Sequence, residues 1–252
     1  MNSGYESFAA FYDRLTANVD YDLIAELVHG LVQKYADYKE VILDLACGTA
    51  SLSEKLAQKG YDVVGVDNSP EMLEIAQQRL EGSGLPVTLL LQDMTELDLY
   101  GAVDCVVCLL DSLNHLKDKQ QLQRAFERVS MFTCDGGLFV FDLNTKYKHT
   151  KVLADNAFNF DNDDFFCAWQ NELSDNGDVH IYLDFFCKQK DGSYIRKSDD
   201  FTEILFEDSF IEYELAKNSF ELIGKYNDFS LEPVEQTSQR VLWVCKKKSV
   251  DK

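Results

Sequence analysis

The stretch VILDLACGTAS (residues 41–51) decides the fold, because it joins a strand to a helix through a turn of small residues. The largely apolar run at 41–46 has the length of a strand, and an amphipathic stretch near 51–59 follows it directly. A turn of small residues lets a ligand approach the backbone, and the first N–H groups of a helix can bind an anionic group. The stretch therefore predicts a ligand site at the carboxyl end of a buried strand.

The same alternation of short apolar runs and amphipathic stretches continues beyond this strand. Runs of Val, Ile and Leu separated by helices are typical of parallel strands buried on both faces. Two helices have clear starting signals, since Ser69 precedes Pro70 and Asp118 can cap a later pattern. We therefore expect an α/β fold with a doubly wound, mostly parallel seven-stranded sheet. The expected strands lie at 41–46, 62–67, 87–92, 105–110, 138–143, 221–229 and 240–247, after two helices within 5–36.

A different pattern interrupts this alternation after the fifth strand. Turn signals at Asn176-Gly177 and Asp191-Gly192 separate strand-like runs, which indicates an antiparallel meander. The run at 179–186 alternates strictly, so one face packs and the other, which carries His180 and Tyr182, meets solvent or a ligand. The expected division is a main domain of 1–144 and 207–252 with a small antiparallel β lid inserted at 145–206.

The composition excludes several classes of function. The 252 residues carry a formal net charge of −20, and such a field repels phosphate backbones, so we expect no nucleic-acid partner. No apolar run approaches the roughly 20 residues of a membrane helix, and no leader is visible, so we expect no membrane partner. The seven scattered cysteines indicate reduced thiols, and the four histidines lack metal-ligand spacing. The sequence predicts a cytoplasmic monomer or homodimer without a metal.

Acidic residues follow the second and third expected strands. Asp67 lies nineteen residues beyond Gly48, where a carboxylate can accept both hydroxyls of a ribose. Asp93 follows the third strand, about where the edge of an adenine would lie. Taken singly, such features are often only tight connections or helix caps. In this order, at successive strand ends of one sheet, they indicate a nucleoside site.

These residues resemble the cofactor half of class I S-adenosylmethionine-dependent methyltransferases, clearly over 41–143 and more loosely over the flanking segments. The segment 5–13 resembles the small bacterial branch with a β-sheet lid after the fifth strand, in which the equivalent of Tyr12 closes over the cofactor. The resemblance implies S-adenosylmethionine as cofactor, with Asp44 by its methionine end and Asp67 on its ribose. The implied cofactor-binding residues are Tyr12, Asp44, Ala46, Cys47, Gly48, Asp67, Asn68, Met72, Asp93, Met94, Leu110 and Asp111.

The turn departs from the family pattern at Ala46 and Ala50, where glycine is common. Alanine adopts a positive φ at a cost on the order of 1 kcal/mol, if the turn demands one. A non-catalytic nucleoside-binding or interaction protein that keeps the fold is therefore an alternative. A third interpretation is an NAD-dependent oxidoreductase, although the register from Gly48 has Ala50 and Ser53 and fails the dinucleotide fingerprint G-x-G-x-x-G/A twice.

The resemblance implies in-line methyl transfer to an N or O nucleophile of a small-molecule acceptor. His115 and Asp111 are the candidates for proton handling, since a positioned histidine contributes about 10² to 10⁴ in rate when a proton must leave. An alternative is that His115 only caps or packs the next helix, because in-line displacement can run without a base. The expected acceptor-side residues are Asn114, His115, His180 and Tyr182.

The expected lid is strongly acidic. Residues 152–215 include 16 acidic and 4 basic side chains. This charge can attract an amine or another cationic acceptor, or it can be only a solvated face.

Overall fold

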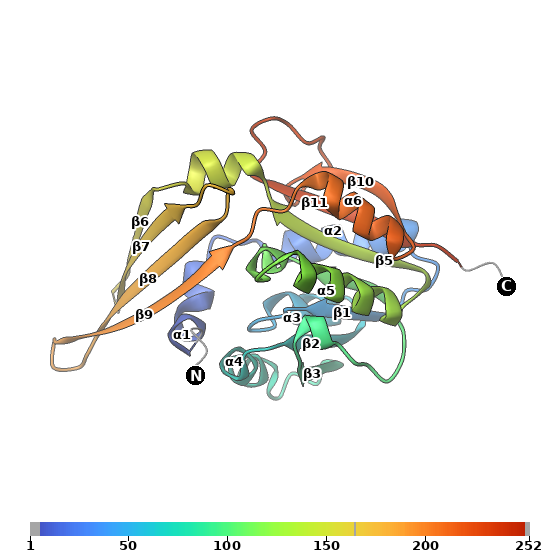
Figure 1. Ribbon diagram of the computed structural model, residues 1–252. Coiled ribbons are helices and arrows are strands. Elements are labelled where there is room, and N and C mark those ends of the chain that lie inside the picture. The colour runs from blue at the N-terminus through green and yellow to red at the C-terminus, as the bar shows by residue number, and fades with distance from the viewer. Residues whose placement is uncertain (1–5, 164, 250–252) are drawn as a thin grey trace.

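A seven-stranded sheet and a separate four-stranded sheet form the computed structural model, which describes residues 6–163 and 165–249 (Figure 1). The large sheet has the order β10-β11-β5-β4-β1-β2-β3. Strands β1 to β5 pair in parallel, whereas β11 is antiparallel to β5 and β10 is antiparallel to β11. The doubly wound, mostly parallel sheet is thereby confirmed. Its strands are β1 (Val41–Leu45), β2 (Asp62–Asp67), β3 (Val87–Leu91), β4 (Val103–Cys108), β5 (Thr133–Asn144), β10 (Phe220–Asn227) and β11 (Arg240–Lys247).

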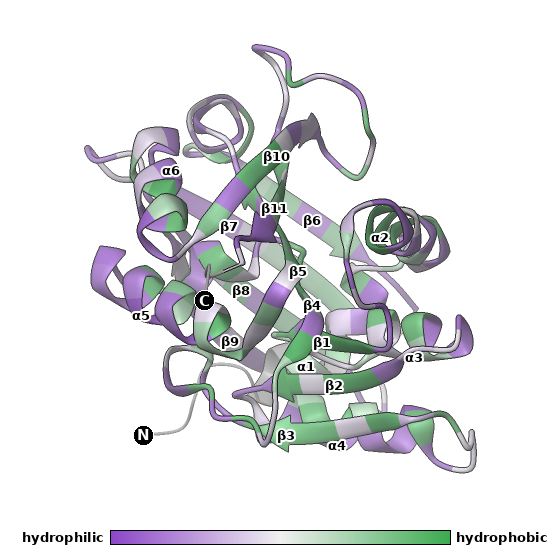
Figure 2. Cartoon of the chain, turned by 90° about the vertical axis from the view of Figure 1, so that its right-hand side faces the viewer, coloured by the Kyte–Doolittle hydropathy of each residue, from purple (hydrophilic) through white to green (hydrophobic). Residues whose placement is uncertain are grey.

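Helices cover both faces of the large sheet. Buried residues of α5 and α6 join one hydrophobic cluster with the strands, and buried residues of α2 and α3 join the cluster on the other face. Figure 2 shows hydrophobic residues concentrated in these strands. The six α-helices are α1 (Glu6–Leu15), α2 (Tyr21–Tyr35), α3 (Ser51–Gln58), α4 (Pro70–Leu80), α5 (Lys119–Phe132) and α6 (Asp208–Lys217).

The helix starts follow the local signals in the sequence. The Ser69 hydroxyl accepts a hydrogen bond from Met72 N at 3.2 Å, and Pro70 occupies the first turn of α4. Asp118 caps α5 in the same way, through Gln121 N at 2.8 Å. Both predicted caps are confirmed, and each satisfies an N–H group that has no partner within its helix.

The second sheet, named here the inserted sheet, is an antiparallel meander of β6 (Ala157–Asp161), β7 (Phe165–Leu173), β8 (Val179–Lys188) and β9 (Tyr194–Glu203). Gly177 and Gly192 lie in its two predicted turns with φ of +91° and +84°, a backbone region that glycine adopts without strain. A π-helical segment, Lys148–Leu153, connects β5 to this sheet. Figure 1 shows the inserted sheet projecting from one side of the large sheet, with α1 beside it.

The predicted segment 5–13 is described only in part. Tyr5 lies outside the described residues, whereas Phe11, Tyr12 and Asp13 belong to α1. Among the described residues, no helix has the length and hydropathy needed to cross a bilayer.

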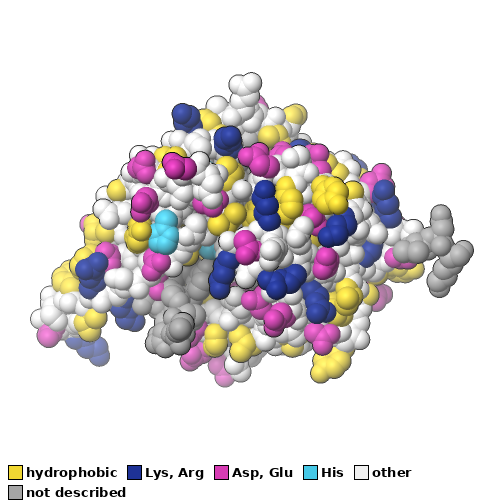
Figure 3. Space-filling view, viewed as in Figure 1, with side chains coloured by type: hydrophobic (Ala, Val, Ile, Leu, Met, Phe, Trp, Pro, Cys, Tyr) yellow, Lys and Arg dark blue, Asp and Glu magenta, His cyan; other side chains and the backbone are white. Residues whose placement is uncertain are grey.

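Charged side chains of both signs cover the molecular face in Figure 3, where Asp and Glu are interspersed with Lys and Arg. Several acidic residues of the 152–215 region have basic partners. Asp184 accepts two hydrogen bonds from Arg196, and Lys225 bridges Asp208 and Glu212. Part of the negative charge of this region is thus compensated locally at the surface.

Candidate functional site

The turn after β1 has a left-handed backbone at three positions. Ala46, Gly48 and Ala50 have φ of +61°, +54° and +61°. Cys47 N donates to Val66 O at 2.9 Å, which holds the turn against β2. The turn therefore does demand positive φ, and its two alanines adopt it at a cost of roughly 1 kcal/mol each.

Asp67 closes the turn from the end of β2. Its Oδ2 accepts from Gly48 N at 2.8 Å and its Oδ1 accepts from Ser69 N at 2.9 Å. Burial raises the pKa of Asp67 although these backbone N–H groups oppose the shift. Each carboxylate oxygen can accept a further hydrogen bond, so the side chain remains able to bind a pair of hydroxyls.

A cavity of about 490 Å³ opens in front of this turn, at the carboxyl ends of the central strands. This is the edge where open α/β sheets bind their ligands. The predicted cofactor residues that line it are Tyr12, Ala46, Gly48, Asp67, Asn68, Met72, Asp93, Met94, Leu110 and Asp111.

Asp44 and Cys47 do not line this cavity. Both are buried, and Asp44 Oδ2 accepts from Ser53 Oγ at 2.5 Å. Burial raises the pKa of Asp44 to about 6. The structure places Asp44 behind the turn, where it binds the first turn of α3 through Ser53, and the contact of Asp44 and Cys47 with the cofactor stays a prediction.

Helix α1 contacts both the turn after β1 and the inserted sheet. A Cβ placed on Gly48 would lie 3.7 Å from Tyr12 Cε1, so the tyrosine ring packs over the turn. Thr49 Oγ1 donates to Asp13 Oδ1 at 2.6 Å, which fastens α1 to the same turn. On its other side, the ring of Phe11 lies 4.7 Å from that of Phe165 in the inserted sheet. Burial and the adjacent Tyr21 raise the pKa of Tyr12, which therefore keeps its proton.

The turn after β4 is held by a partly buried arginine, Arg240, that the sequence analysis missed. Leu110 and Asp111 have φ of +60° and +53°. Arg240, at the start of β11, donates from Nη2 to Asp111 Oδ1 and from Nη1 to Asp142 Oδ2, both at 2.6 Å. Asp111 N also donates to Asp142 Oδ2 at 2.8 Å. One guanidinium therefore joins strands β4, β5 and β11 below the cavity.

The same ion pair fixes the charge of Asp111. Burial alone would raise the pKa of Asp111, but the Arg240 guanidinium outweighs burial and holds that pKa well below its usual range. Asp111 thus stays ionised at neutral pH. Of the two predicted proton-handling residues, Asp111 is better interpreted as a fixed negative charge and His115 as the group that can take a proton.

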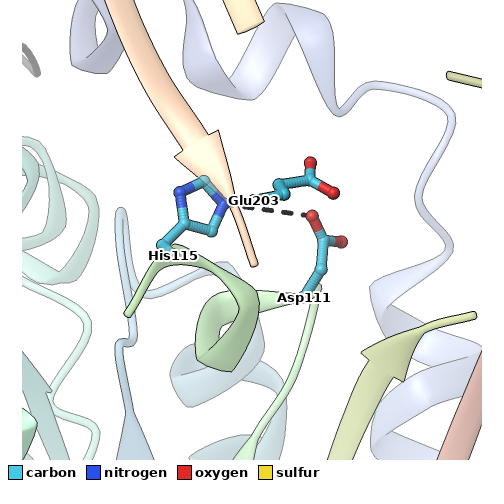
Figure 4. A group of neighbouring side chains, drawn as sticks. All are labelled: Asp111, His115 and Glu203. Atoms are coloured by element: carbon cyan, nitrogen blue, oxygen red, sulfur yellow. Dashed lines mark ion pairs between the residues drawn. The ribbon is translucent and has the colours of Figure 1, made fainter. Parts of the chain in front are cut away.

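The imidazole of His115 faces the side chains of Asp111 and Glu203, as Figure 4 shows. Its Nε2 is 4.0 Å from Asp111 Oδ2, and one ligand atom each from Asp111, His115 and Glu203 lie within 4.8 Å of one another. These residue types can bind a divalent cation. However, Asp111 is already paired with Arg240 and Glu203 accepts from Asn144. We therefore interpret the group not as a metal site but as one that can bind a charged group and accept a proton.

The inserted sheet contributes its apolar face to the cavity, not the face that carries His180 and Tyr182. Trp169, Leu183, Phe201 and Glu203 line the cavity. His180 instead contacts Thr202 and Asp200, and the 43% exposed Tyr182 donates to Glu172. These two predicted acceptor contacts are therefore corrected to the opposite face of β8.

Asn114 has a different place from the one predicted. It is fully buried, donates from Nδ2 to Ile204 O at 2.8 Å and accepts from Asn144 N at 3.0 Å. It does not line the cavity, and instead joins the large sheet to the segment that follows the inserted sheet.

The doubly wound sheet, the cavity at its carboxyl edge and the Asp67 carboxylate define a nucleoside-binding protein of the Rossmann-like class. Comparisons narrow this class. A family profile described as a methyltransferase domain matches residues 42–137. A protein of Geobacillus sp. (strain WCH70), named as a methyltransferase, is 33% identical over 245 residues, covering 96% of this chain and 99% of that protein.

Solved structures agree with this similarity. The crystal structure of a S-adenosylmethionine-dependent methyltransferase from Clostridium acetobutylicum ATCC 824 has a TM-score of 0.88 and 32% identity, over 97% of this chain and 99% of that one. The sugar N-methyltransferase KedS8 from Streptoalloteichus sp. ATCC 53650 shares the fold at 21% identity, with a TM-score of 0.78 over 96% and 93% of the two chains. The chain belongs to the class I S-adenosylmethionine-dependent methyltransferases, and S-adenosylmethionine is its cofactor.

Proposed function

We propose that the chain methylates the nitrogen of a small amine bound between the carboxyl ends of β4 and β5 and the inserted sheet. The observation that carries the proposal is the Asp111–His115–Glu203 group at this end of the cavity. Asp111 is already paired with Arg240, whereas Glu203 has no Lys or Arg partner among the described residues, so the Glu203 carboxylate can attract a cationic acceptor. The indole of Trp169 and the ring of Phe201 line the same space.

An amine acceptor needs both the carboxylates and the imidazole of this group. At neutral pH it arrives as an ammonium ion, which a carboxylate binds, but its nitrogen can attack only after it has lost a proton. His115 is placed to accept that proton, and the fixed charge of Asp111 beside it stabilises the imidazolium that results. Bound cofactor supplies an electrophilic methyl group, and the closed cavity limits the access of competing water.

A hydroxyl acceptor is the second possibility within the same reaction class. His115 could take its proton in the same way. A hydroxyl, however, gives Glu203 no positive charge to bind, so this carboxylate favours the amine. The nicotinamide and non-catalytic interpretations are not favoured, because the similar proteins are named as methyltransferases.

The experiment uses cofactor labelled in the methyl group and a cell extract divided by size. We expect label to move to the small-molecule fraction, and we expect prior acetylation of that fraction, which blocks amines, to abolish the transfer. Label that enters only the macromolecular fraction would overturn a small acceptor. Transfer that survives acetylation would assign the acceptor atom to a hydroxyl oxygen. His115→Gln, which keeps a polar side chain but accepts no proton, should lose most of the transfer.

A further inference from the structure

The last residue of the inserted sheet places a carboxylate in the cavity. Glu203 ends β9, is only 4% exposed, and lies on the apolar face of the sheet, where its strand partner is Val179. A charged group that is buried on an apolar face is costly unless other groups bind it. The contacts of Glu203 therefore show which groups stabilise its carboxylate and which oxygen remains for a ligand.

Asn144 holds one oxygen of this carboxylate. Lys148 Nζ lies 2.9 Å from Asn144 Oδ1, and because an ammonium can only donate, this contact fixes which end of the amide is the oxygen. The Asn144 Nδ2 group then points to Glu203 and donates to its Oε2 at 2.7 Å. The side chain of Glu203 is thus oriented by the last residue of β5.

His149 faces the same oxygen from the π-helical segment. It is fully buried, and its Nδ1 lies 2.9 Å from Gly177 O, which can only accept, so Nδ1 carries a proton. Its Nε2 lies 3.6 Å from Glu203 Oε2 and makes no hydrogen bond among the described residues. The imidazole edge of His149 therefore packs against Oε2 without donating to it.

These contacts concentrate on one oxygen. Asn144 and His149 both meet Oε2, so Oε1 is the oxygen that remains for a ligand. The carboxylate of Asp111 lies in the same group, with the imidazole of His115 also within 4.8 Å. Arg240 pairs with Asp111, and Lys148, which also lines the cavity, donates to Asn144. Glu203 is therefore the carboxylate of this group that remains for a small cation.

We infer that Glu203 is the ammonium-binding residue for the acceptor, opposite Asp111, and that Asn144 is a positioning residue that holds Glu203 through Oε2. This inference deepens the proposed function and rests on it. An amine that enters the cavity is bound by Glu203 Oε1, beside the imidazole of His115. Asn144 does not touch the amine and acts only through the carboxylate.

The test uses sinefungin, a cofactor analogue in which a carbon carrying a primary ammonium replaces the methylsulfonium. S-adenosylhomocysteine, which lacks this positive group, reports cofactor binding and correct folding. Titration calorimetry of both ligands gives the ratio of their dissociation constants. Glu203→Gln should weaken sinefungin by about 10-fold, the typical value of one charge-assisted hydrogen bond, and should leave S-adenosylhomocysteine unchanged.

Matched variants separate this role from a structural one. Glu172→Gln makes the same change on the opposite face of the inserted sheet and should alter neither constant. Asn144→Leu, which removes the donor to Oε2, should shift the ratio in the same direction as Glu203→Gln. Asn144→Gln, which keeps an amide donor, should shift the ratio less.

Two results would overturn the inference. One is that Glu203→Gln weakens neither ligand, and the other is that it weakens both ligands equally, since either leaves the ratio of the two dissociation constants unchanged. A failure of the proposed function is distinguishable, because the label would then survive acetylation or enter macromolecules whatever the sinefungin ratio shows.

Discussion

The two alanines of the cofactor turn lower the stability of the fold but keep the turn in its ligand-binding shape. Ala46 borders the cavity and Ala50 is fully buried, yet both have a φ that glycine adopts more easily. The Cys47 N–H bond to Val66 O holds the turn in this shape, so binding geometry is kept at the expense of stability. The strain therefore belongs to the folded state of the free protein, before any ligand binds.

Ala46→Gly should stabilise the protein by up to about 1 kcal/mol, because it relieves the left-handed alanine. Urea unfolding of the variant and the parent measures the change. Ala57→Gly, within α3, is the matched control and should destabilise by a similar amount, since glycine weakens a helix interior. If both variants lose stability equally, the turn is not strained.

Asp44 should make stability depend on pH. Burial raises its pKa to about 6, so between the usual carboxyl pKa and 6 the native state keeps a proton that the unfolded state releases. Stability from this group is therefore lost as pH rises through that window, by about 1 kcal/mol between pH 5 and 7.5. Asp44→Asn should lack this component in urea unfolding at the two pH values. An identical pH dependence in both proteins would contradict the assignment.

At the scale of elements, the site depends on side chains that link strands distant in sequence. Arg240 joins β11 to the ends of β4 and β5, and Glu203 brings the end of β9 to the same cavity. Each of these elements has its own hydrophobic face, but only the polar links fix how the strand ends meet. The ligand cavity is therefore built by contacts between elements, not by one motif.

Arg240→Met should destabilise the protein by about 3 kcal/mol, because it leaves the buried Asp142 and the partly buried Asp111 without their cation. Adding Asp111→Asn should recover part of the loss. Arg196→Met, which breaks an exposed ion pair on the inserted sheet, is the control and should change stability little. Chemical denaturation of the four proteins tests the series, and a double variant no better than Arg240→Met would refute the shared role.

The sequence predicts the strands, the helix caps and the turns of the inserted sheet, because hydrophobic periodicity and capping are local properties. It does not identify Arg240 or Glu203, since each is a single charged residue beside an apolar run and its partners lie far away in the chain. The alternation of β8 shows two faces but not which one is covered. Phe11 of α1 packs on the apolar face, stacking on Phe185, and this leaves His180 and Tyr182 outside the cavity.

At the scale of the whole molecule, ligand binding should stabilise the fold measurably. S-adenosylhomocysteine at 100 times its dissociation constant should contribute about 2.7 kcal/mol and raise the thermal midpoint by roughly 5 to 10 °C, whereas NAD should not. Asp67→Ala should weaken binding by about 10- to 150-fold, so the shift at the same concentration falls to about half or less. An undiminished shift would remove Asp67 from the ribose site.

Helix α1 packs against both the cofactor turn and the inserted sheet, since Tyr12 covers the turn while Phe11 packs into the sheet. We therefore expect that release of the thionucleoside product and of the methylated product requires movement of this helix. The rate at which this helix detaches then sets the maximal turnover rate, and a faster chemical step would not raise that rate. Under such a limit, acceptors of very different intrinsic reactivity would be consumed at nearly the same maximal rate.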